Sequence, residues 1–160
     1  MTAFRRVMAK QKGIGDDGGI RDWDGSGDGP DRLPEVVVVH TTPRGTQRAL
    51  AAAAELARGL SARVRLVAAQ VVPYPRMLTD PPTSMEFTKV KFKSLAAETA
   101  VEVKVDVRYC RDVEEMLLYA LNPGSLVVVG CERKWWPTTE RRLAWRLRRN
   151  GHHVVTAERQ

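Results

Sequence analysis

The stretch Ser125-Leu-Val-Val-Val-Gly-Cys131 decides the fold that we expect for this chain. Its run of apolar, mostly β-branched residues predicts a strand that is buried on both faces, as strands of parallel sheets are. The glycine at its end predicts a turn of the backbone toward a helix. Because open α/β sheets bind ligands at the carboxyl ends of their strands, the residues around Gly130 belong to a candidate site.

A second buried strand is predicted at Val36-Val-Val-Val-His40, followed by the turn Thr41-Thr-Pro-Arg-Gly45 and an alanine-rich helix over 46–60. Continuous valine runs require cover on both faces of the sheet. We therefore expect this strand and the strand at 126–129 to be adjacent and central. Their carboxyl ends would then flank one crevice.

The rest of the chain alternates between strand and helix patterns. Strands are predicted at 64–72, 101–107 and 152–156, and helices over 84–99, from Asp112 to the Asn122-Pro-Gly124 stop signal, and after a cap at Thr138 or Thr139. The strict alternation of 101–107 indicates a position near a sheet edge. The helix over 84–99 has Phe87, Val90, Leu95 and Ala96 available for burial. This alternating order predicts a doubly wound α/β fold with a parallel sheet.

Composition divides the chain at residue 34. Residues 1–34 hold six aspartates and most of the glycines, which predicts a disordered leader, and residues 35–160 form one α/β domain. No apolar run is long enough for membrane insertion and no signal peptide is recognisable, so we expect a cytoplasmic protein. The two cysteines, Cys110 and Cys131, lack metal-ligand spacing and are expected to be buried free thiols, with no metal site.

Four phrases of the sequence resemble the universal stress protein family. They are Glu35-Val-Val-Val-Val-His-Thr-Thr42, Arg48-Ala-Leu-Ala-Ala-Ala-Ala-Glu-Leu-Ala57, Val67-Ala-Ala-Gln-Val-Val-Pro73 and Leu126-Val-Val-Val-Gly130. The resemblance covers roughly residues 35 to 158. It implies a five-stranded parallel sheet in the order 3-2-1-4-5 with helices on both faces, frequent homodimers and, in one subset, ATP bound between the ends of strands 1 and 4.

The ATP-binding subset carries the loop Gly-x2-Gly-x9-Gly-Ser/Thr, whose backbone amides cradle phosphates. Only Gly130 matches, because Arg133 takes the place of the second glycine and His40-Thr-Thr42 replaces the usual acidic turn. We therefore expect weak or absent ATP binding and no cofactor. If a nucleotide is bound after all, through a rewired basic loop, the candidate residues are His40, Thr41, Thr42, Val72, Gly130, Arg133, Thr138 and Thr139.

The last predicted helix lies in the basic part of the chain. Residues 130–151 contain seven lysines and arginines against two glutamates. Trp145 lies among Arg141, Arg142, Arg148 and Arg149. Such a stripe can bind nucleic acid or an acidic partner through phosphate contacts and stacking, and it is equally typical of an exposed indole held between arginines.

These patterns favour a non-catalytic module in stress response or regulation. We expect no enzyme, since no nucleophile and base pattern stands out, and we expect action through an unknown protein partner with nucleotide binding lost or degenerate. Two alternatives are an adenine-nucleotide sensor with a rewired basic loop, and a nucleic-acid or acidic-partner binder that uses the basic helix. The last strand, 152–156, is expected at a sheet edge, where it would pair with a second copy to form a homodimer.

Overall fold

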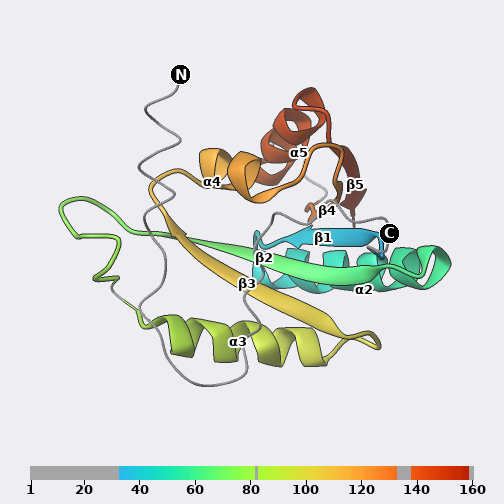
Figure 1. Cartoon of the computed structure of the whole chain (residues 1–160), viewed down its shortest axis with the longest axis horizontal. Helices are drawn as coiled ribbons and strands as arrows, with labels where there is room; N and C mark the ends of the chain where they lie inside the picture. Colours follow the sequence, from blue (N-terminus) through green and yellow to red (C-terminus); the bar gives the residue numbers. More distant parts are fainter. Residues whose placement is uncertain (1–32, 82, 133–137, 159–160) are drawn as a thin grey trace. The chain divides into compact units, whose positions relative to one another are not determined.

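The computed structural model describes residues 33–81, 83–132 and 138–158. Five strands form one parallel sheet in the order β3-β2-β1-β4-β5 (Figure 1). The strands are β1 (Glu35–Val39), β2 (Arg63–Val71), β3 (Val103–Cys110), β4 (Leu126–Gly130) and β5 (His153–Ala157). The expected fold class and strand order are confirmed. Residues 1–32 of the predicted leader over 1–34, and the candidate residue Arg133, lie outside the described residues.

The valine runs form the centre of the sheet. Strand β1 pairs with β2 on one side and with β4 on the other, in a register that places Val37 opposite Val127. Every residue from Val36 to Val39 is at most 1% exposed, and Val127 to Val129 are fully buried. The prediction of two adjacent central strands is therefore confirmed. Strands β3 and β5 form the two edges, as the alternating pattern of the third strand indicated.

Four helices connect the strands, each with a side-chain cap at its start. They are α2 (Pro43–Leu60), α3 (Met85–Ala97), α4 (Val113–Ala120) and α5 (Thr139–Arg149), and the capping residues are Thr42, Ser84, Asp112 and Thr138. Each cap accepts a hydrogen bond from the backbone N–H three residues ahead, which satisfies one of the free donors of the first turn. Helix α2 begins earlier than predicted because Pro43 is tolerated at the first helical position.

The helices cover both faces of the sheet, with α2 and α3 on one face and α4 and α5 on the other (Figure 1). Alternate side chains of β1 point to opposite faces of the sheet. Val36 and Val38 pack in the cluster with α2, whereas Val37 and Val39 pack with α4 and α5. This explains why the strand must be apolar at every position. No helix in residues 33–81, 83–132 or 138–158 is long and apolar enough to span a bilayer.

The buried face of α3 differs from the expectation. Phe87 and Val90 are 65% and 66% exposed, so the prediction that they are buried is wrong. Ala96 is buried as expected, and the other buried residues of the helix are Thr88 and Phe92, so the three are spaced by four residues. The Thr88 hydroxyl donates to the side-chain oxygen of Gln70 on β2, at 3.0 Å. This cross-element contact helps set the rotation of α3 and leaves Phe87 and Val90 outside.

Candidate functional site

The carboxyl ends of β1 and β4 meet without a gap. The Thr41 hydroxyl donates to the Gly130 carbonyl at 3.2 Å, which joins the two strand ends directly. A Cβ added to Gly130 would lie 1.8 Å from the carbonyl oxygen of Gly45, so the first turn of α2 packs directly onto the end of β4. Gly130 is therefore required for close packing of a helix on the sheet.

Other candidate groups at the strand ends already have partners within the chain. The Thr42 hydroxyl oxygen accepts from the Gly45 N–H at 3.1 Å as the cap of α2. Val72, directly after β2, is fully buried. Its N–H donates to the Cys110 carbonyl at 2.9 Å, and its own carbonyl accepts from the Arg111 guanidinium. A nucleotide would have to displace these bonds in order to use the same groups.

The start of α5 is engaged in the same way. The Thr138 hydroxyl oxygen accepts from the Arg141 N–H at 3.4 Å, and Thr139 is the exposed first residue of the helix. The first amide after Gly130 belongs to Cys131, and it donates to the Ala157 carbonyl at 3.0 Å. That amide completes the pairing of β4 with β5, so it is not free to cradle a phosphate.

His40 points toward α3, whereas its neighbour Thr41 reaches Gly130. Its Nδ1 lies 2.8 Å from the Thr46 hydroxyl oxygen, and the Thr46 hydroxyl donates to the Thr42 carbonyl at 2.8 Å. With that hydroxyl proton assigned to the Thr42 carbonyl, Nδ1 carries the proton of the neutral ring and acts as the donor. The imidazole also packs edge-on against Phe92, with ring centroids 4.6 Å apart.

A cavity of about 210 Å³ lies beside His40 in the groove between α2 and α3. Its walls are His40, Pro43, Lys91, Phe92, Ser94, Leu95 and Glu98. Burial, and then the charge of Lys91, lower the pKa of His40 to about 4, so its imidazole is neutral at physiological pH. Sequence reasoning missed this cavity because its walls come from two helices with a strand between them in the chain. The only signal was a histidine at a strand end.

The lowered pKa of His40 predicts a loss of stability in acid. In the unfolded chain His40 binds a proton near pH 6.5, but the folded chain resists protonation until about pH 4. Stability therefore falls as the pH drops from 6.5, by about 2 kcal/mol at pH 5 for this residue. The variant His40→Asn keeps a donor near Nδ1 and does not titrate. Urea unfolding should show that this variant loses less stability between pH 7 and pH 5 than the native chain does. Equal losses of stability in the two proteins would contradict the prediction.

Most arginines of α5 tie the helix to its neighbours. Arg141 pairs with Glu158 at 3.0 Å, Arg146 pairs with Glu114 on α4, and Arg148 donates to the Val154 carbonyl at 3.0 Å. Trp145 is 54% exposed, with the Arg149 guanidinium over its ring at 4.8 Å. Arg142 is exposed beside them. The charge that is free to meet a nucleic acid or an acidic partner is therefore smaller than the residue count suggests.

The cysteines are poorly suited to nucleophilic chemistry. Cys110 and Cys131 are both free and buried, as expected. Burial raises the pKa of each thiol, and nearby carboxylates add to the effect, so little reactive thiolate forms at neutral pH. Among the described residues, no group of three side chains of the metal-binding types lies close enough together to hold an ion.

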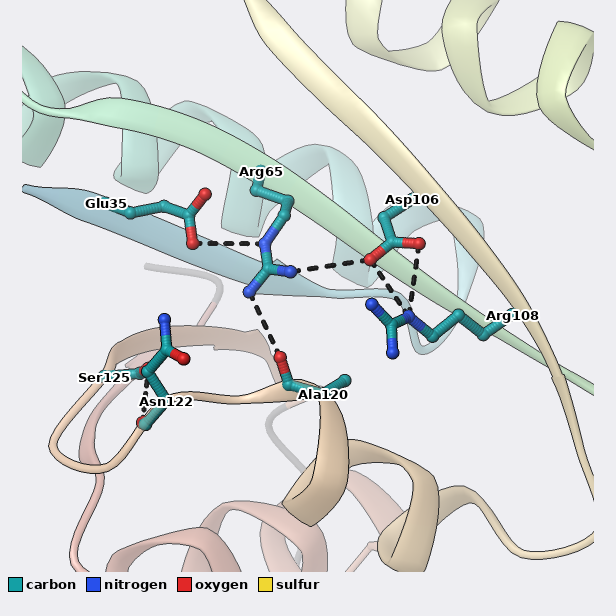
Figure 2. Close-up of polar contacts among 7 residues, drawn as sticks. All are labelled: Glu35, Arg65, Asp106, Arg108, Ala120, Asn122 and Ser125. Atoms are coloured by element: carbon teal, nitrogen blue, oxygen red, sulfur yellow. Dashed lines mark hydrogen bonds and ion pairs between the residues drawn. The ribbon is translucent and has the colours of Figure 1, made fainter. Parts of the chain in front are cut away.

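A buried arginine that the sequence analysis did not identify lies near the amino ends of the strands (Figure 2). Arg65 of β2 is 2% exposed, and its guanidinium forms ion pairs with Glu35 at 3.1 Å and with Asp106 at 3.5 Å. It also donates to the Ala120 carbonyl at 3.4 Å. These groups link β1, β2, β3 and the end of α4. Arg65 is thus part of the structural core and lies away from the candidate site.

Together, the parallel order 3-2-1-4-5 and the meeting of strand ends at β1 and β4 define a doubly wound α/β protein, with the switch point of the sheet between these two strands. The chain has the fold of the universal stress proteins, and at the level of fold the resemblance suggested by the sequence is confirmed.

Three solved structures illustrate this similarity. A universal stress protein family member from Burkholderia pseudomallei is 19% identical with a TM-score of 0.50, over 78% of this chain and 95% of the other. A universal stress protein in complex with cAMP is 13% identical with a TM-score of 0.50, over 77% and 95%. One from Archaeoglobus fulgidus is 16% identical with a TM-score of 0.49, over 78% and 97%. No protein-family model and no curated protein matches the sequence.

Proposed function

We propose that this chain is a non-catalytic module of the stress response that acts by association with protein chains and no longer uses its nucleotide crevice. One observation supports the loss of nucleotide binding: the polar groups at the ends of β1, β2 and β4 already have hydrogen-bond partners within the chain. Thr41 bonds to Gly130, and Val72 bonds to Cys110 and Arg111. Freeing buried backbone groups for a ligand costs the bonds that they already make.

The proposal predicts that the full chain does not bind adenine nucleotides. Isothermal titration calorimetry with magnesium-ATP should show no saturable heat up to about 1 mM ligand, an affinity weaker than about −4 kcal/mol. The same result is expected for cAMP, which we include because a solved protein of this fold was crystallised with it.

A matched variant tests why adenine nucleotides are not expected to bind. Arg133→Gly restores the second glycine of the phosphate loop in the sequence. It should still not bind, because the Cys131 amide and the Val72 backbone keep their partners. Saturable binding of ATP or cAMP by the native chain would overturn the proposal in favour of the nucleotide sensor. Binding by the variant alone would show that the loop, and not the bonded strand ends, prevents binding.

We further propose that association involves the free edge of β5. His153 donates to the Ser125 carbonyl, and Ala157 accepts from the Cys131 amide. Because bonding alternates along a parallel strand, the backbone groups of Val154 and Thr156 face away from β4. Arg148 covers the Val154 carbonyl, while Val155 is 37% exposed. An edge of this kind is a template for pairing with another strand, and we propose a second copy as the partner.

The edge-pairing proposal predicts a homodimer at tens of micromolar, measured by light scattering on the full chain. Val154→Pro removes an N–H that faces the edge and leaves the ladder with β4 intact, so it should give a folded monomer. The control Val154→Thr keeps both the N–H and the β-branched shape and should stay dimeric. A monomeric native chain would contradict the proposal, as would a Val154→Pro variant that dimerises as the native chain does.

A further inference from the structure

The groove between α2 and α3 contains a hollow with room for a small ligand. The cavity of about 210 Å³ beside His40 has an apolar lining of Pro43, Phe92 and Leu95. An enclosed apolar cavity of about 150 Å³ is large enough to bind benzene, so by volume this more open hollow has room for a ring with short substituents. A second cavity of about 240 Å³ continues along the groove and shares Leu95 with the first.

His40 gives this cavity one well-defined polar atom. Its Nδ1 proton is directed to Thr46, which leaves Nε2 as the acceptor of the neutral ring. No hydrogen bond to Nε2 is found within residues 33–81, 83–132 and 138–158. The ring stays neutral at physiological pH because its pKa lies near 4. Nε2 is therefore able to accept a hydrogen bond from a ligand group that donates one, such as a hydroxyl.

Lys91 adds a positive charge to the wall of the same cavity. Its side chain is exposed, and in the described part of the chain it forms no ion pair. It is close enough to His40 to lower the pKa of the imidazole. Glu98, the C-cap residue of α3 about 10 Å further along the helix direction, accepts from the Gln47 amide at 2.9 Å and so has a partner. An anionic ligand group would therefore be attracted to Lys91 and away from Glu98.

We propose that this cavity binds a small hydroxylated aromatic acid. Its ring would lie against Phe92 and Leu95, its hydroxyl would donate to His40 Nε2, and its carboxylate would lie beside Lys91. The site goes beyond the proposed association through β5. It is also distinct from the crevice at Gly130, because His40 and Thr41 point in different directions from the same strand end.

The proposal can be tested by nuclear magnetic resonance on the ¹⁵N-labelled full chain. Titration with 3- or 4-hydroxybenzoate should shift amides of α2 and α3 around His40 and Lys91, with a Kd between about 10 μM and a few mM for a ligand of this size. The matched methoxybenzoates cannot donate to Nε2 and should bind about tenfold more weakly. No shifts at 10 mM ligand, shifts confined to another region, or equal binding of the methoxybenzoates would overturn the proposal.

Three variants locate the site. Lys91→Gln should weaken binding about fivefold or more through loss of the charge, whereas Lys93→Gln, an exposed lysine outside the cavity, should bind as the native chain does. Ser94→Trp places a large ring on the exposed cavity wall and should abolish binding while the amide spectrum elsewhere stays native. Equal weakening by the two lysine variants would indicate general attraction by the basic surface, and the proposed site would then be wrong.

Discussion

Gly130→Ala is expected to destabilise the protein by about 3 kcal/mol or more, the largest effect that we predict for a single methyl group. The added Cβ would lie 1.8 Å from the Gly45 carbonyl oxygen and 2.7 Å from the Gly45 Cα. Both are backbone atoms in the first turn of α2, so no side-chain rotation can relieve the contact. Overpacking of a core typically costs about 1–3 kcal/mol, and here a helix must move away from the sheet.

The matched control for Gly130→Ala is Gly59→Ala. A Cβ at Gly59 meets nothing within 4 Å, and the residue lies within α2. Alanine should therefore stabilise the protein by about 0.5–1 kcal/mol through helix propensity. Urea unfolding of both variants measures the difference. A Gly130→Ala variant as stable as the native chain would show that α2 does not pack on β4 as described. The crevice at the ends of β1 and β4 would then have space for a ligand.

The double variant Glu35→Gln, Asp106→Asn is expected to lose about 3–5 kcal/mol of stability. It removes the two carboxylates that lie 3.1 and 3.5 Å from the guanidinium of Arg65 and leaves a buried positive charge without them. The Arg65 side chain is only 2% exposed, so water cannot replace the lost carboxylates. The amide side chains keep similar volumes, which separates the effect of charge from that of packing.

A surface ion pair provides the control for the Arg65 prediction. Glu55 and Arg58 of α2 pair at 2.5 Å, with side chains 74% and 50% exposed. Glu55→Gln should change stability by no more than about 0.5 kcal/mol, because solvent screens an exposed pair. Thermal or urea unfolding at neutral pH compares the stability of the double variant with that of Glu55→Gln. If the double variant were as stable as Glu55→Gln, the ion pairs of Arg65 would not stabilise the folded protein as we infer.

The order of the elements followed from local properties of the sequence. The valine runs at 36–39 and 126–129 required burial on both faces, and this placed them at the centre of a parallel sheet before any contact was known. Thr138 was recognisable as a helix cap because a hydroxyl bonds to an amide only three residues ahead. The burial of both cysteines was likewise predicted. Periodicity and capping involve residues within one or two turns, so a single sequence reveals them.

Only the tertiary structure decided what the strand ends can bind. The contact of Gly130 with Gly45, the partners of Val72 and the direction of His40 join residues that are far apart in the chain. The same is true of Arg65, which appeared in the sequence as one charge within an apolar strand, and of the rotation of α3, which left Phe87 exposed. The pattern of a segment shows which residues are apolar or polar. Which of those groups meet depends on the packing of helices against a completed sheet.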